Sequence, residues 1–178
     1  MTHKEQVKKQ RKEKDHYVAT HPQSPLTPEQ KRDFKGLNYF PVNEELRFDP
    51  VEVEVLQEKE LFEMQTNTGQ IQRYLTFGKA KFTVQGKKLE LMIYTNPQIP
   101  DYYFVPFWDL TVQSGETYGA GRYLELDRKA DDTFVLDFNK AYNPYCAYNE
   151  RWTCPLTPPD NRLEVRVEAG EKVFHAKE

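Results

Sequence analysis

The chain contains few of the residues on which metal sites and nucleophilic triads are built. Among its 178 residues there are two cysteines, two serines and four histidines. Neither serine stands in a Gly-x-Ser-x-Gly motif, and no histidine lies near the cysteines to complete a four-ligand zinc site. We therefore predict no metal site, and neither a triad nor a cofactor is indicated. The histidines stand near the ends of the chain: His3, His16, His21 and His175.

The chain also lacks long apolar runs and an excess of positive charge. No stretch approaches the roughly 20 residues that span a bilayer, and the first 14 residues lack the apolar core of a secretory signal. The net charge of -3 offers no basic field to nucleic acid. We therefore expect no membrane span, no nucleic-acid partner and a cytoplasmic location, while a form with a removed leader stays open. That location favours free thiols.

A run of charge occupies the first 22 residues. Through Lys14 there are six Lys or Arg against two acids, and apolar anchors are few. We predict a solvated helix over residues 2–20 that lies on the rest of the chain. The alternative is a basic arm that contacts an anionic partner. The chain is thus divided into a charged arm, residues 1–22, and a single β-rich domain, residues 23–178.

Residues 24–37 are predicted to form a second, shorter helix. Thr27 can cap it, Pro28 suits the first helical position, and Gln30 completes a Thr-x-x-Gln capping box. Gly36 is a natural stop.

From Val51 onward the apolar period changes to two, as in Val-Glu-Val-Glu-Val. Short alternating runs separated by turn residues are typical of an antiparallel meander. We predict a mainly β fold, an antiparallel β-sandwich or small barrel of about nine strands with two N-terminal helices. The expected strands are 51–55, 61–66, 71–77, 79–84, 88–94, 101–108, 119–126, 133–138 and 163–169, after which Gly170 turns the chain into Lys172–His175.

Two glycines precede Arg122 in the sequence Tyr-Gly-Ala-Gly-Arg-Tyr-Leu. No third glycine or helix follows, so this is not a dinucleotide-binding motif. If the segment is a regular strand, Tyr118, Ala120 and Arg122 share one face. An arginine beside small residues can hold a carboxylate in a bidentate grip. An internal partner is favoured, with Asp109 and Asp137 as candidates; the alternative partner is a ligand.

Residues 143–162 hold both cysteines and four of the twelve prolines. This is too much proline for a helix interior or a central strand, and the aromatic side chains argue against a flexible linker. We predict a rigid, packed loop. Packed thiols are the favoured interpretation of Cys146 and Cys154; a disulfide or redox pair is the first alternative, and a metal site is the least favoured.

Polar residues stand where the last strand before this loop ends, namely Asp137, Asn139 and Asn143. Turn formation explains such residues, because Asn and Asp side chains bind nearby backbone. The functional alternative is a small-molecule pocket that these groups form with Tyr145, Tyr148 and Trp152.

Several motifs follow one another in a characteristic order. They are S-P-L, F-K-G-L-N-Y-F-P-V, F-V-P-F-W-D-L-T, G-E-T-Y-G-A-G-R-Y-L, L-D-F-N-K-A-Y-N-P, N-P-Y-C-A-Y-N-E-R-W-T-C-P-L-T-P-P-D-N-R-L and V-E-A-G-E-K. Together, from about Pro25 to Lys172, they resemble the bacterial and archaeal family catalogued as domain of unknown function 1684. Related chains often look exported or lipid-anchored. The resemblance implies a bacterial or archaeal protein and assigns no activity to any residue.

The leading hypothesis is a small-molecule-binding β domain whose site lies where the 143–162 loop meets Arg122, which would contact an anionic group. One alternative is a hydrolase that uses Asp109 or Asp137 as acid or base. Another is a structural or interaction module without a ligand. The candidate ligand-binding residues are Asp109, Tyr118, Arg122, Asp137, Asn139, Asn143, Tyr145, Cys146, Tyr148, Trp152, Cys154, Asn161 and Arg162.

Overall fold

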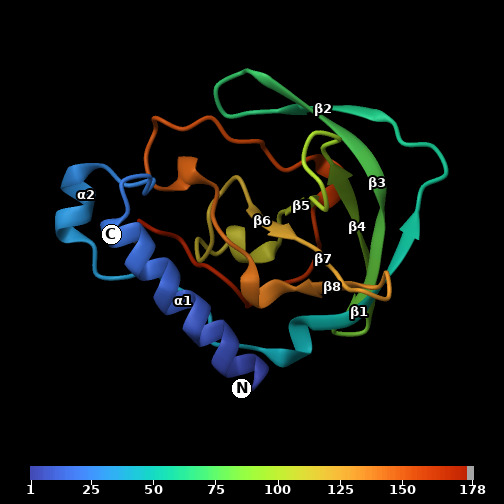
Figure 1. The fold of residues 1–178 in the computed structure, drawn as a ribbon, viewed down its shortest axis with the longest axis horizontal. Coiled ribbons are helices and arrows are strands. Elements are labelled where there is room, and N and C mark those ends of the chain that lie inside the picture. The colour runs from blue at the N-terminus through green and yellow to red at the C-terminus, as the bar shows by residue number, and fades with distance from the viewer. Residues whose placement is uncertain (176–178) are drawn as a thin grey trace.

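The computed structural model describes residues 1–175 and shows a mainly β protein with helices at its N-terminal end (Figure 1). The strands are β1 (Arg47–Val55), β2 (Leu61–Gln65), β3 (Ile71–Val84), β4 (Lys87–Thr95), β5 (Tyr103–Phe107), β6 (Arg122–Glu125), β7 (Asp127–Arg128) and β8 (Phe134–Asp137). They pair antiparallel in the order β6-β5-β4-β3-β1-β8-β7, with β2 on β3. Only Leu126 separates β6 from β7, so the sheet curls into a nearly closed barrel. The predicted fold class is confirmed.

Helix α1 (His3–Thr20) lies along one side of the barrel (Figure 1). It begins with a reciprocal cap, in which Glu5 N–H donates to the Thr2 hydroxyl and Thr2 N–H donates to the Glu5 carboxylate. Its apolar face is thin: Val7 and Val18 are its buried residues, each 2% exposed. The division of the chain at residue 22 stays a prediction. No helix among residues 1–175 is both long and apolar enough to cross a membrane.

Helix α2 (Pro28–Asp33) is shorter than the predicted 24–37. Its capping box forms as expected between Thr27 and Gln30. Before it, the Ser24 hydroxyl donates to Val18 O, which ties the chain back to the end of α1. After it, Phe34 turns to extended backbone and packs with Leu37 around Val18. Tertiary packing therefore ends the helix before Gly36.

The two strands predicted at 71–77 and 79–84 are one strand, β3, which runs through Gly78. A Cβ at Gly78 would lie 2.5 Å from Glu54 O. The glycine therefore permits close approach of β1 to β3 instead of ending the strand.

The predicted strand across Gly119 and Gly121 is wrong in its first half. Gly121 N–H donates to Tyr118 O over 3.0 Å, which closes a turn, and β6 begins only at Arg122. Tyr118, Ala120 and Arg122 therefore do not share a strand face. A Cβ on Gly121 would lie 2.5 Å from both Phe107 O and Thr157 Oγ1, so the turn packs directly against neighbouring chain.

The predicted strand 163–169 and the segment Lys172–His175 form no regular strand. Val165, Val167 and Ala169 are buried in the core as the alternation predicts. However, the carbonyls of Val167 and Ala169 accept hydrogen bonds from the Arg122 guanidinium. These carbonyls are therefore taken by a side chain and not by a neighbouring strand.

Two apolar cores lie on opposite faces of the sheet. The larger fills the barrel and includes Phe107, Leu124 and Leu136. The other covers the outer face, where Tyr94, Phe104 and Tyr123 pack against the 143–162 loop; its members are Met64, Tyr74, Tyr94, Phe104, Tyr123 and Cys154, with Cys146 and Trp152 beside them. The loop is thus packed down on the sheet, as predicted.

Candidate functional site

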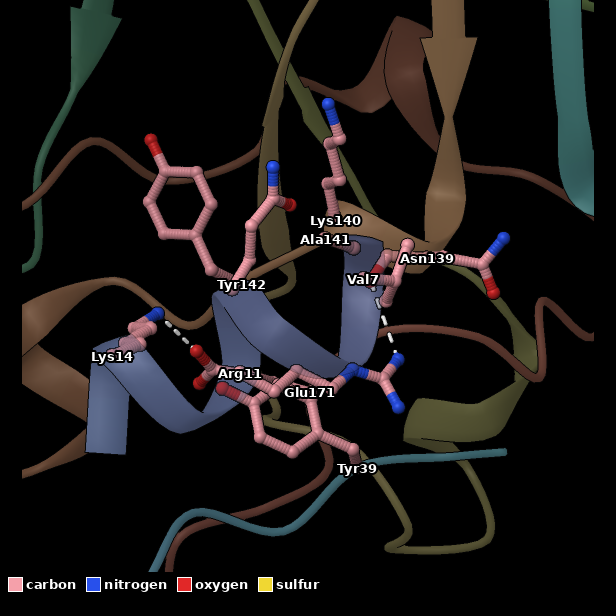
Figure 2. Close-up of a pocket in the computed structure, with 10 residues that line it drawn as sticks. Val7, Arg11, Lys14, Tyr39, Asn139, Lys140, Ala141, Tyr142 and Glu171 are labelled. Carbon is pink, nitrogen blue, oxygen red and sulfur yellow. Dashed lines mark hydrogen bonds and ion pairs between the residues drawn. The ribbon is translucent and has the colours of Figure 1, made fainter. Parts of the chain in front are cut away.

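A cavity of about 200 Å³ lies between α1 and the body of the protein (Figure 2). Its walls come from α1, from residues 139–142 after β8, and from two single positions, Tyr39 and Glu171. Four of the lining side chains carry charge: Arg11, Lys14, Lys140 and Glu171. We call this space the α1 cavity.

Arg11 crosses from α1 to the wall of the α1 cavity. Its guanidinium donates to Phe40 O over 2.9 Å and to Asn139 O over 3.3 Å, and it lies 4.4 Å from the centre of the Tyr39 ring. Burial lowers the pKa of Arg11, although nearby Tyr39, Asp137 and Glu171 oppose that shift. Within residues 1–175 no carboxylate lies within ion-pair distance of it. Among residues 1–175, the direct partners of this half-buried positive charge are therefore two carbonyl oxygens and the ring of Tyr39, all neutral.

Glu171 is the carboxylate of the α1 cavity and is 1% exposed. It pairs with Lys14, accepts a hydrogen bond from the Tyr148 hydroxyl over 2.8 Å and accepts one from Asn143 N–H over 3.3 Å. Figure 2 shows the link from Lys14 to Glu171. The charge of Glu171 is thus compensated inside the protein.

Two donors on the cavity residues lack partners. The Arg11 Nε and the Tyr39 hydroxyl are buried without a hydrogen bond among the described residues. Burial raises the pKa of Tyr39, which keeps its phenol neutral and able to donate. Buried polar groups without partners are rare, and a bound ligand or water is one explanation for them.

Arg122, the arginine that the sequence analysis placed at a ligand site, is 1% exposed inside the barrel. It donates to Asp109 over 3.1 Å and to the carbonyls of Val167, Ala169 and Glu171. The favoured prediction of an internal partner is confirmed, and that partner is Asp109. Because Arg122 faces inward and Tyr123 faces outward, the structure does not bring the guanidinium beside the cysteines of the loop.

Asp137 and Asn139 organise the turn after β8. Asp137 accepts from both the backbone and the side-chain nitrogen of Asn139, at 3.0 and 2.9 Å. Asn139 in turn makes two 2.8 Å hydrogen bonds with the backbone of Asn43. His3 Nε2 lies 2.7 Å from the other oxygen of Asp137 and so holds the start of α1 to this turn. Asn139 also lines the α1 cavity.

The aromatic residues of the loop pack on one another: the ring centre of Tyr145 lies 5.1 Å from that of Trp152 and 6.3 Å from that of Tyr148. Tyr148 is buried on Glu171, Trp152 Nε1 donates to Pro25 O over 3.0 Å, and Tyr145 is 40% exposed. The three rings thus form one cluster, whereas the hydrogen bonds of Asp137 among residues 1–175 go to His3 and Asn139. Asn143 donates to Lys172 O over 3.0 Å and stands just behind the α1 cavity through its contact with Glu171.

The structure brings three of the candidate residues together at the two thiols. Cys146 N–H donates to Cys154 Sγ over 3.3 Å, and the Tyr118 hydroxyl donates to Cys146 Sγ over 3.5 Å. The hydrogen bond between the thiols, assisted by Tyr118, lowers the pKa of Cys146 to about 6 against the effect of burial. The same hydrogen bond and burial raise the pKa of Cys154. Both cysteines are free thiols, and residues 1–175 hold no group of three or more His, Cys, Asp or Glu side chains placed for a metal ion.

The last two candidates, Asn161 and Arg162, hold the loop against the sheet. Asn161 is fully buried and makes hydrogen bonds of 2.8 to 3.0 Å with the backbone of Met92 and Pro106. Arg162 lies 5.3 Å from the centre of the Trp108 ring. Neither residue lines the α1 cavity.

The α1 cavity includes residues that the sequence analysis did not single out. Arg11 and Lys14 were hidden in a run of charge that looked solvated. Tyr39 and Glu171 stand inside the motifs F-K-G-L-N-Y-F-P-V and V-E-A-G-E-K. The sequence signal that could have pointed to Tyr39 and Glu171 was thus a polar or charged residue inside each of these two motifs.

Comparison with known proteins places this geometry in a family. The model of the family described as "Protein of unknown function (DUF1684)" matches residues 32–172. A solved structure, the solution NMR structure of an uncharacterized protein of Haloarcula marismortui, is 37% identical with a TM-score of 0.71, and the match covers 94% of this chain and 92% of that one. No curated protein matches the chain. The chain therefore belongs to the DUF1684 family of proteins of unknown function.

Proposed function

We propose that this protein binds a small anionic molecule in the α1 cavity. The observation that carries the proposal is Arg11, a cationic side chain in the cavity wall that has carbonyl partners but no carboxylate partner among residues 1–175. An ion is costly to bury without a counter-charge, and a bound anion would supply it. The candidate site is thus displaced from Arg122, whose charge Asp109 already balances.

The size and lining of the cavity restrict the ligand. Its volume of about 200 Å³ is below the roughly 300–1,000 Å³ of pockets for drug-sized ligands, which favours a small metabolite. Lys14 adds a second cation, which has three donor hydrogens and pairs with Glu171. Val7, Ala141 and the ring of Tyr142 offer apolar contact. A small carboxylate with a short apolar part fits these features.

The hydrolase alternative has no such observation in its favour. Asp109 accepts hydrogen bonds from Arg122, Thr111 and Val167 N–H, and it is 1% exposed. Asp137 is held by His3 and Asn139. Each carboxylate would have to release structural partners before it could act as acid or base.

A thermal-shift titration with acetate, pyruvate, succinate and inorganic phosphate tests the binding proposal. We expect at least one carboxylate to raise the unfolding temperature in a concentration-dependent way, because a ligand that binds only the folded state stabilises it. Arg11→Gln should abolish the shift. Lys12→Gln removes the same charge from an exposed position of the same helix and should keep it. Absence of any shift, or equal shifts in the two variants, would contradict the proposal.

A further inference from the structure

We propose that Cys146 and Cys154 form a redox-active dithiol that a hydroperoxide oxidises to an intramolecular disulfide, with Cys146 as the attacking sulfur and Cys154 as the resolving sulfur. None of the residues that line the α1 cavity takes part, so the inference is independent of the proposed anion binding.

The two thiols occupy different environments within one site. Cys146 is partly exposed, whereas Cys154 is 6% exposed and packed in the outer core. Their proximity is fixed by the 3.3 Å hydrogen bond from Cys146 N–H to Cys154 Sγ. Redox-sensing cysteines are typically accessible, of low pKa and placed beside a second cysteine that resolves the oxidised form. The pair has this asymmetry.

A hydrogen-bond donor, the Tyr118 hydroxyl, is placed to stabilise the Cys146 thiolate. The Tyr118 hydroxyl donates to Cys146 Sγ over 3.5 Å, and burial raises the pKa of Tyr118, so the phenol keeps its proton. The lowered pKa of Cys146, about 6, agrees with this geometry. The thiolate is the nucleophilic form of cysteine. Tyr118 therefore acts on the reaction by positioning and stabilising the attacking sulfur.

The backbone on both sides of the pair is fixed. Asn67 Oδ1 accepts from Cys154 N–H over 2.7 Å, and Asn67 N–H donates to Cys154 O over 3.2 Å. On the other side, Tyr148 N–H donates to Tyr145 O over 3.0 Å and closes the turn that carries Cys146. The sulfurs are thus held as neighbours by contacts outside the pair itself.

The proposed chemistry is balanced with a hydroperoxide as the oxidant. The Cys146 thiolate attacks the peroxide oxygen that carries hydrogen, the O–O bond breaks, and the leaving hydroxide or alkoxide takes a proton to become water or an alcohol. Cys146 is now a sulfenic acid. Cys154 loses its proton and attacks the Cys146 sulfur; the S–O bond breaks, and hydroxide leaves with that proton as water. Two thiols have given two electrons to the peroxide.

The test uses the full chain, reduced with dithiothreitol, freed of reductant and treated with one equivalent of hydrogen peroxide at neutral pH. We expect both thiols to disappear together and the intact mass to fall by two hydrogens. A peptide linking Cys146 to Cys154 should be found, and dithiothreitol should reverse all three changes. Persistence of both free thiols in the folded protein under excess peroxide would overturn the proposal.

Two single variants separate the roles of the sulfurs. Cys154→Ala should stop at a Cys146 sulfenic acid that dimedone traps, whereas Cys146→Ala should leave Cys154 at least about tenfold slower to oxidise, because its thiol is buried and largely protonated. Equal trapping at both sulfurs would show two ordinary thiols and overturn the assignment. Circular dichroism checks that each variant is folded, and the wild-type experiment stands without them.

Discussion

Arg122 Nη2 and Asp109 Oδ1 lie 3.1 Å apart, and both side chains are 1% exposed inside the barrel. The guanidinium also binds the carbonyls of Val167, Ala169 and Glu171, while Asp109 accepts from Val167 N–H over 2.7 Å. This ion pair therefore connects β6 to the irregular segment that follows residue 163. In that segment, hydrogen bonds from the side chains of Arg122 and Asp109 satisfy backbone groups that a regular strand would have paired with a neighbouring strand.

Removal of Arg122 should destabilise the fold strongly. Arg122→Ala leaves the Asp109 charge buried and three carbonyls without their donor, and breaking a buried pair costs about 3–5 kcal/mol. Urea denaturation measures the free energy of unfolding. As a control, Arg166→Ala removes an arginine whose side chain is 36% exposed and paired with Glu116 and Glu168, where a much smaller loss is expected because exposed ion pairs contribute little. Similar losses in the two variants would contradict the structural role of Arg122.

The parts of the fold that depend on local pattern could be predicted from sequence. Alternating valines in β1 and the capping box at Thr27 specify their elements through neighbours in the chain. Gly78 was misleading because a glycine looks the same in a sequence whether it ends a strand or admits a crossing one. The distinction lies in Glu54 O, a group more than 20 residues away in the chain.

The candidate site depends on contacts between residues that are far apart in the chain, and no local sequence pattern encodes such contacts. Asp109 could be named, together with Asp137, as a candidate partner of Arg122 because a buried charge needs a counter-charge, but only the structure shows that the partner is Asp109. The α1 cavity could not be anticipated, because Arg11, Tyr39 and Glu171 are far apart in the sequence and come together only in the folded structure. A charge run gives no sign of which one of its residues turns inward.

Substitution of Gly121 should destabilise the protein more than substitution of another glycine that has a positive φ but open space around it. Gly121 has φ +100°, and an added Cβ would lie 2.5 Å from Phe107 O. Gly86 has φ +77° and nothing within 4 Å of its Cβ position. Gly86→Ala should cost about 1–2 kcal/mol from the left-handed backbone alone. Gly121→Ala adds about 1–3 kcal/mol of overpacking, so a smaller loss at Gly121 than at Gly86 would refute the close approach.

Glu125 should make the wild-type protein less stable as pH rises. Burial raises its pKa above the ordinary 4.5, although a hydrogen bond from the Tyr142 hydroxyl opposes the shift. Between 4.5 and that raised value the unfolded state loses the proton first, so the contribution of this group to stability falls as pH increases. Glu125→Gln keeps the acceptor for Tyr142 and has no proton to lose.

The free energy of unfolding of Glu125→Gln relative to wild type should therefore increase with pH through this window and then level off. The comparison with wild type cancels the carboxylates that shift in the opposite direction. Glu58→Gln changes an exposed glutamate and should show no such increase. If the free-energy difference between Glu125→Gln and wild type also stays constant with pH, Glu125 ionises equally easily in the folded and unfolded states.

Alkylation of Cys146 by iodoacetamide should follow a titration with its midpoint near pH 6, because the thiolate is the reacting form and the pKa of Cys146 is lowered to about 6. Tyr118→Phe removes the hydroxyl that donates to Cys146 Sγ and should raise the midpoint by about one pH unit, the order expected for one hydrogen bond to a charged group. Tyr145→Phe removes the hydroxyl of the adjacent, 40% exposed tyrosine and should leave the midpoint in place.

Mass spectrometry of the labelled peptides distinguishes Cys146 from Cys154, which should label only at higher pH because its pKa is raised. A common midpoint for both cysteines would mean that the thiol pair has no attacking member, and the asymmetry inferred from the hydrogen bonds would be wrong.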